Sequence, residues 1–216
     1  MLSTHPLDDP SLRPLLSPVR LATYEAACGG DVAQAMRLYA WNIEASAALW
    51  GGFSVLEVCL RNAMSLQLEA YTKQADWWNS PRVKLRAEQQ AAVTTASSNS
   101  PGQVVSSLTF GFWSSLLANR YHQQLWVPSL HLAFPYLVGR RGTAHQDLEH
   151  LRRLRNRLAH HEPIFGRDLL GDHKMTIKVL SWINPAASEW VKRDSRLPGV
   201  AASQSITVTG NRKTTF

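Results

Sequence analysis

Cysteine is scarce in this sequence. The 216-residue chain has two cysteines, Cys28 and Cys59, and both lie among apolar residues. Two are too few for a disulfide framework or a cysteine-rich metal site, and they fit a reducing cytosol. Charged residues are also few, at 18%, while apolar residues make up 44%. This balance excludes a disordered chain and predicts a buried core, and the length favours a single domain.

Long apolar runs are missing as well. No uninterrupted run in the sequence reaches the roughly 18 apolar residues that a membrane-spanning helix needs. Residues 1–20 lack both the basic start and the apolar stretch of a secretory signal. We therefore expect a soluble, cytoplasmic protein with no membrane partner.

Strand patterns and repeats are absent too. No stretch alternates apolar and polar residues for long enough to build a sheet, and no segment repeats with the period of a solenoid. Apolar residues instead recur three and four positions apart, as they do on one face of a helix. The fold class that we predict is all-α.

The N-terminal half is expected to hold one long helix. Residues 1–16 carry three prolines and form an extended lead-in, and residues 17–198 form the helical domain. Ser17-Pro18 is typical of an N-cap and first position, for a helix that Gly29-Gly30 ends. Asp31 caps the next helix, single or in two collinear parts, which extends to about Tyr71. Gly51-Gly52 is its expected kink or point of close packing.

The C-terminal half is expected to hold shorter helices. Residues 199–216 have no leucine and a single aromatic residue, so we expect a flexible tail. The other predicted elements are a helix opened by Ser80-Pro81, a loop at 94–102, helices at 110–119, 174–183 and 185–193, and a helix from Thr143 to about His160.

Positive charge is concentrated on the last of these helices. The chain has 23 Lys and Arg against 16 Asp and Glu, a net charge of +7, which favours a polyanionic partner. Residues 140–157 hold six arginines and two acids, a net +4 of that total. Leu148, Leu151, Leu154 and Leu158 predict a narrow apolar stripe that packs on the core.

The polar residues of this helix suggest phosphate chemistry. Arg152, Asn156 and His160 follow one another at four-residue steps, and Arg155 lies beside their line. A guanidinium matches a phosphate, and an imidazole can take or give a proton near neutral pH. The alternative is a solvated face whose terminal histidine complements the helix dipole.

A metal site is not predicted, and neither is any other cofactor. His145, His150 and His160 are spaced by five and ten residues, which does not stack ligands on one helix face. His161-Glu162 does not begin the zinc-binding pattern of two histidines one turn apart. Phosphodiester cleavage on this helix would therefore proceed without a metal.

Three blocks carry a family resemblance. The segment RNRLAH at residues 155–160 is followed by HEPIF, and WNIEASAALWGGFSVLEVCLRNAM (41–64) and LTFGFWSSLL (108–117) precede it. Together they resemble the Abi-like family of the HEPN superfamily, bacterial proteins linked to abortive infection and toxin–antitoxin modules. The superfamily motif is an arginine, commonly followed by a polar residue, and then a histidine four to six residues further on. Here these are Arg155, Asn156 and His160.

The resemblance implies a HEPN-type helical bundle with additional helices, paired as a homodimer around a shared cleft. It also implies a metal-independent endoribonuclease that cuts RNA through 2′-hydroxyl attack, as a toxin or anti-phage effector with a possible protein or RNA antitoxin. Arg155 would hold the scissile phosphate, Asn156 would orient the groups, and His160 would transfer protons. On position and charge, Arg152, Arg157, His161 and Arg61 are candidate RNA contacts.

Other interpretations stay open. A HEPN module can also be non-catalytic and bind RNA or a partner protein. A nucleotidyl-transfer target or antitoxin partner is less favoured, because the sequence has no glycine-rich phosphate loop or paired carboxylates. Glu57 and Arg61 can form an ion pair within their helix or a dimer contact, or Arg61 can add to the cleft. Trp77, Trp78 and Trp113 can stack on bases, but core positions are more typical.

Overall fold

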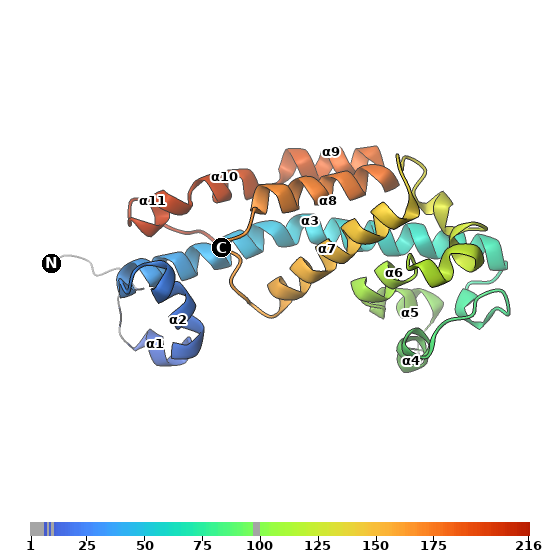
Figure 1. Cartoon of the computed structure of the whole chain (residues 1–216), viewed down its shortest axis with the longest axis horizontal. Coiled ribbons are helices and arrows are strands. Elements are labelled where there is room, and N and C mark those ends of the chain that lie inside the picture. The colour runs from blue at the N-terminus through green and yellow to red at the C-terminus, as the bar shows by residue number, and fades with distance from the viewer. Residues whose placement is uncertain (1–6, 8, 10, 97–99) are drawn as a thin grey trace. The chain divides into compact units, whose positions relative to one another are not determined.

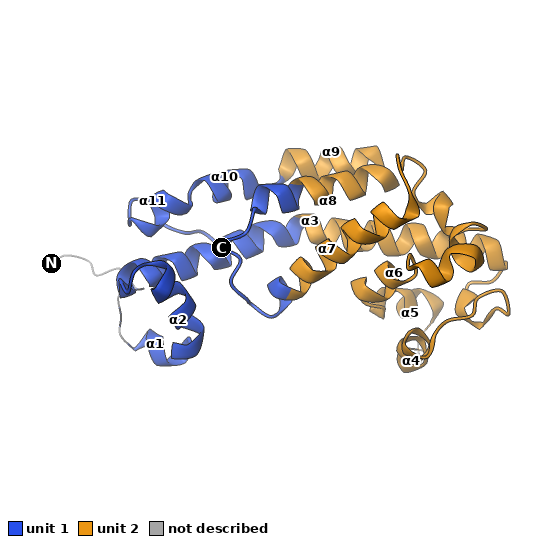
Figure 2. Cartoon of the chain, in the orientation of Figure 1, with its two compact units in different colours: residues 1–51, 157–173, 195–216 blue, residues 52–156, 174–194 orange. Residues whose placement is uncertain are grey.

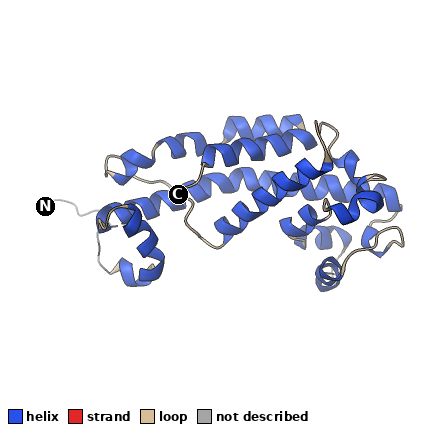
Figure 3. Ribbon diagram, in the orientation of Figure 1, coloured by secondary structure: helices blue, strands red, loops and turns tan. Residues whose placement is uncertain are grey.

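The computed structural model describes residues 7, 9, 11–96 and 100–216. Every regular element in these ranges is helical and none is a strand, which confirms the all-α class (Figure 3). The longest helix is α3 (Val32–Thr72), labelled with the others in Figure 1. It is a single helix, as one of the two sequence expectations had it.

The glycine pair inside α3 marks close packing. A Cβ atom on Gly52 would lie 3.3 Å from Cγ1 of Val191 and 3.6 Å from Cγ2 of Thr176, whereas Gly51 faces open space. A methyl group at residue 52 would therefore fit against Thr176 but would be tight against Val191. A stretch of α3 is also long and apolar enough to cross a membrane, by a test that buried core helices pass as well.

The chain divides into two compact units, coloured separately in Figure 2. Unit 1 comprises residues 1–51, 157–173 and 195–216, and unit 2 comprises residues 52–156 and 174–194. Three helices contribute residues to both units: α3, α7 (Arg141–Ala159) and α8 (Leu169–Ile183).

Unit 1 also contains α1 (Leu12–Leu15), α2 (Pro18–Ala27), α10 (Leu197–Ala202) and α11 (Gln204–Val208). Trp41 is buried, and its indole Nε1 donates to the carbonyl of Val200 over 2.9 Å. The ring of Tyr24 contacts those of Tyr39 and Phe165, with centroids 5.3 and 5.1 Å away. A buried tryptophan and an aromatic cluster thus form the centre of this unit.

Most helix ends in unit 1 lie where the sequence predicted them. Pro18 is the first residue of α2, and Asp31 caps α3 by accepting from the amide of Gln34 over 2.9 Å. Gly29 and Gly30 both have positive φ and end α2 as expected. Ser17 occupies the predicted N-cap position, but it has a φ of 66° and its side chain makes no capping hydrogen bond.

Residues 199–216 differ from the expected flexible tail. They contain most of α10 and all of α11, and Val200 and Thr207 are buried. Arg212 forms an ion pair of 2.6 Å with Glu44, a buried carboxylate of α3. Burial and this ion pair therefore order the C-terminal segment, although it contains no leucine. The expected lead-in likewise contains α1, while residues 1–6, 8 and 10 lie outside the described residues.

Unit 2 contains most of the short helices. These are η2 (Trp77–Asn79), α4 (Ala87–Ala96), α5 (Pro101–Ser107), α6 (Phe110–Ser115), η3 (Asn119–Tyr121), the π-helix η4 (His122–Trp126), η5 (Leu130–Ala133) and α9 (Pro185–Asp194). Trp77 and Trp113 are fully buried with ring centroids 5.9 Å apart, and Trp78 is buried beside Trp77. The three tryptophans are therefore core residues, and base stacking on them is excluded.

Three helix starts differ from the sequence prediction, and one of them is that of α8, which begins at Leu169, five residues before the expected start at Lys174. The helix expected from Pro81 begins only at Ala87, because Val83 closes a turn onto the carbonyl of Ser80 and buries its side chain. The charged helix α7 begins at Arg141, ahead of Thr143. The predicted loop at 94–102 is partly helical, since α4 runs to Ala96 and α5 starts at Pro101, and residues 97–99 lie outside the described residues.

Candidate functional site

The apolar stripe of α7 is buried as predicted. Leu148, Leu151, Leu154 and Leu158 are all within 1% of complete burial. The charged residues of α7 therefore lie on its remaining faces. The helix ends at Ala159, and His160 follows it in a turn.

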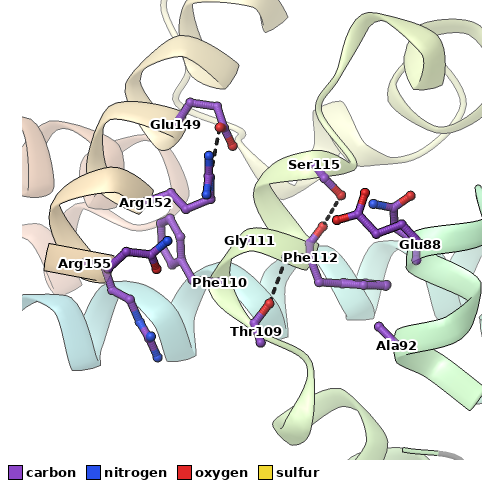
Figure 4. Close-up of a pocket in the computed structure, with 12 residues that line it drawn as sticks. Glu88, Ala92, Thr109, Phe110, Gly111, Phe112, Ser115, Glu149, Arg152 and Arg155 are labelled. Carbon is purple, nitrogen blue, oxygen red and sulfur yellow. Dashed lines mark hydrogen bonds and ion pairs between the residues drawn. The ribbon is translucent and has the colours of Figure 1, made fainter. Parts of the chain in front are cut away.

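Three predicted site residues line one cavity of unit 2. Its volume is about 460 Å³, and α7 contributes Glu149, Arg152, Arg155 and Asn156 to its wall. Figure 4 shows the labelled α7 residues on one side of the α6 segment and those of α4 on the other. The rest of the lining is Glu88, Gln89 and Ala92 of α4, and Thr109, Phe110, Gly111, Phe112 and Ser115 of α6 and its cap.

A network of hydrogen bonds holds Arg152. Its Nε lies 2.9 Å from Oε2 of Glu149, and Oε1 of the same carboxylate accepts from Ser114 over 2.7 Å. Burial alone would raise the pKa of Glu149, but the hydrogen bonds from Ser114 and Arg152 outweigh it, and the pKa lies below its ordinary value. Glu149 is thus a charged anchor that fixes Arg152 at the cavity.

Arg155 is placed by α3. Its Nε lies 3.6 Å from Oε2 of Glu57, a half-buried ion pair between α7 and α3. Arg61, one turn after Glu57, donates from Nη1 to the carbonyl of Ser106 over 3.2 Å. A Glu57–Arg61 ion pair was one of the interpretations that the sequence left open, and in the structure both side chains have longer-range partners instead. Arg61 is not among the residues that line the cavity.

His160 belongs to unit 1. It lines a depression of about 370 Å³ together with Ser17, Val19, Arg20, Thr23, Glu162 and Pro163. Arg157 forms an exposed ion pair of 3.0 Å with Glu162, and the carbonyl of His161 accepts from Arg20. The motif therefore continues across the unit boundary, with Arg155 and Asn156 in unit 2 and His160 in unit 1.

The residues after His160 are anchored through the backbone. Asn42 is buried, and its Oδ1 accepts from the amide of Ile164 over 2.7 Å. The carbonyl of Phe165 accepts from Nε2 of Gln204 over 3.0 Å. The HEPIF segment is therefore fixed by side chains that are far from it in the sequence.

Metal ligands are not grouped in the described ranges. No set of three or more His, Cys, Asp or Glu residues there could hold a metal ion. His145, one turn before Glu149, has a lowered pKa because it is partly buried, and the nearby arginines lower it further.

Several residues that line the cavity were not predicted as site residues from the sequence. The spacing of Glu149 and Arg152, three residues apart on a helix, does signal an ion pair, although the sequence analysis counted Glu149 only as a charge. Glu88 and Gln89 gave no signal, because only the packing of α4 brings them to the cavity.

Comparisons with protein-family models, curated proteins and solved structures give no match for this chain.

Proposed function

We propose that this chain is a metal-independent endoribonuclease of the HEPN type, related to the Abi-like family, that acts as a toxin or abortive-infection effector. The observation that supports this most is the cavity in which Arg152, Arg155 and Asn156 meet. Two guanidinium groups and an amide at one cavity wall suit a phosphodiester, because both groups donate hydrogen bonds to phosphate oxygens.

The chemistry needs no cofactor. In this proposal the 2′-hydroxyl oxygen of the substrate attacks the adjacent phosphorus, while the bond from phosphorus to the 5′-oxygen breaks. The 2′-hydroxyl proton is taken up by a base, and the leaving 5′-oxygen receives a proton. Arg155 stabilises the charge that develops on the phosphoryl oxygens, Asn156 orients the reacting groups, and His160 transfers protons.

The active form in this proposal is a homodimer in the cytoplasm. Pairing of two chains would bring two copies of the motif to a shared cleft, with RNA as substrate and a protein or RNA antitoxin as the restraint. Light scattering coupled to size exclusion tests the pairing. A strictly monomeric active enzyme would contradict the shared cleft.

Cleavage in the presence of EDTA tests the activity. Purified protein is incubated with RNA beside the variants Arg155→Ala, His160→Ala and Arg153→Ala. Arg153 is the matched control, because it is an exposed arginine of α7 outside the cavity. We expect the first two variants to lose at least about 100-fold in rate, typical of losing general acid–base or charge stabilisation. Cleavage that persists in both would point to a contaminant and refute the assignment.

One observation favours a second function. His160 lines a depression of unit 1 and is not among the residues of the cavity. The cavity by itself offers phosphate binding without an imidazole, as expected of a non-catalytic HEPN module that binds RNA or a partner. RNA binding without cleavage, lost in Arg152→Ala and Arg155→Ala, would support this alternative.

A further inference from the structure

The α4 wall of the cavity carries a buried amide. Gln89 is 3% exposed, and its Oε1 lies 3.1 Å from the hydroxyl of Tyr121. That hydroxyl accepts from the backbone amide of Arg86 over 3.0 Å, so its own proton is left to donate to Oε1 of Gln89. Tyr121 thereby fixes which end of the Gln89 amide is the acceptor.

The other end of the Gln89 amide is a donor with no protein partner. Within the part of the chain that the structure describes, no hydrogen bond engages Nε2 of Gln89. This nitrogen is not one of the fully buried side-chain atoms that lack a partner, so it remains open to solvent. Gln89 lines the cavity, so a ligand there can supply the acceptor.

Glu88 adds two acceptors to the same cavity lining. It precedes Gln89 on α4 and is exposed. An ionised carboxylate only accepts hydrogen bonds. The α4 wall therefore presents one fixed donor and a carboxylate, while the α7 wall presents the guanidinium groups of Arg152 and Arg155.

We propose that this cavity holds one nucleotide of the RNA, with its phosphate at Arg152 and Arg155 and its base at Glu88 and Gln89, and that it selects guanine. The inference rests on the proposed function, since it names the substrate preference of that site. The cavity volume of about 460 Å³ falls in the range of small-ligand pockets, about 300–1,000 Å³.

Guanine is the base that matches this wall. Its Watson–Crick edge carries two adjacent donors, N1–H and the N2 amino group, next to the O6 acceptor. A carboxylate receives both donors, and the Gln89 amide donates to O6. Adenine, cytosine and uracil do not have two neighbouring donors on that edge.

Binding of short RNAs tests the preference. The His160→Ala protein is titrated into labelled uridine heptamers whose central residue is guanosine, inosine, adenosine or cytidine, and fluorescence anisotropy is read. We expect guanosine to bind at least about tenfold more tightly than adenosine or cytidine, with inosine in between, because inosine lacks the N2 amino group. Equal affinity for guanosine and inosine would overturn the role of Glu88.

Variants of α4 separate base recognition from the fold. Glu88→Gln and Gln89→Leu are compared with Gln90→Leu, a control at an exposed position of α4 outside the cavity. We expect the first two to reduce the guanosine preference to about threefold or less, and the control to keep it, with thermal unfolding reporting the fold of each. A preference unchanged in Glu88→Gln would overturn the inference.

Failure of the inference and failure of the proposed function give different results. If the four RNAs bind equally well and Arg152→Ala or Arg155→Ala abolishes binding, the phosphate site stands and the guanine preference is wrong. If the protein binds none of the RNAs, both are wrong.

Discussion

A Cβ atom placed on Gly111 would lie 3.3 Å from Cδ of Arg152. The backbone of α6 and the aliphatic part of this arginine are therefore packed more closely than a methyl group between them would comfortably allow. Glu149 holds the guanidinium at the other end, with 2.9 Å between Oε2 and Nε. The position of one of the two cavity arginines thus depends on a glycine in a neighbouring helix.

Replacing Gly111 by alanine should weaken RNA binding without lowering the stability of the fold. In Gly111→Ala the flexible Arg152 side chain has to move by a few tenths of an ångström, while the helix gains up to about 1 kcal/mol of propensity. We expect an unfolding free energy that is equal or slightly higher, and RNA binding that is weaker by several-fold. Gly142→Ala is the control, because nothing lies within 4 Å of a Cβ there. Unchanged RNA binding in Gly111→Ala would show that the position of Arg152 does not matter.

The lowered pKa of Glu149 predicts a pH-dependent contribution to stability. A carboxyl group whose pKa falls on folding stabilises the protein at pH values above its ordinary pKa, here 4.5. This stabilisation is lost as the pH falls through the lowered pKa of the folded protein. Glu149→Gln should therefore be less stable than the parent at neutral pH by about 1.5–3 kcal/mol, the range for a hydrogen bond to a charged group. The difference should close below pH 4.5. Chemical denaturation at several pH values measures it.

An exposed ion pair provides the control for Glu149. Glu189 and Lys192 are 3.4 Å apart, with most of both side chains in solvent. Glu189→Gln should change the unfolding free energy by less than about 1 kcal/mol at every pH, because exposed pairs contribute little. If Glu149→Gln behaves in the same way, the Glu149 network does not stabilise the fold.

The sequence predicted the periodic parts of the fold well. The long helix α3, the leucine stripe of α7 and the cap at Asp31 all follow from patterns within a few residues of one another. The C-terminal segment could not be predicted in this way. Its ordering depends on Arg212 and Glu44, which are 168 residues apart in the sequence.

The candidate site was predictable only along its own helix. Arg152, Arg155 and Asn156 were found because one helix presents them at regular steps, and all three line the cavity. Glu88 and Gln89 reach the same cavity through the packing of α4, which no local pattern encodes. The partner of Arg155 was also missed, because Glu57 was assigned to its neighbour on α3.

Loss of Arg212 should destabilise unit 1 in a pH-dependent manner. Glu44 is 1% exposed and accepts from both terminal nitrogens of Arg212, which together hold the pKa of Glu44 below its ordinary value against the effect of burial. Arg212→Met leaves a buried carboxylate without its partner and should cost about 3 kcal/mol at neutral pH. The loss should shrink as Glu44 becomes protonated below pH 4.5.

Two further variants check this interpretation by denaturant unfolding. Lys213→Met removes an exposed charge next to Arg212 and should have little effect. In the Arg212→Met background, Glu44→Gln removes the unpaired charge and should restore part of the stability. An Arg212→Met protein as stable as the parent would mean that the C-terminal segment does not depend on this ion pair.

Removal of the Asn42 side chain should loosen the segment that follows His160. Asn42→Ala leaves the buried amide of Ile164 without an acceptor, which costs about 1–3 kcal/mol. We expect a lower unfolding free energy and faster hydrogen exchange at the Ile164 amide, because its opening is no longer opposed by this bond. Asn62→Ala, at an exposed position of α3, is the matched control and should change neither. If Ile164 exchanges as slowly in Asn42→Ala as in the parent protein, the hydrogen bond from the Ile164 amide to Asn42 does not hold the segment.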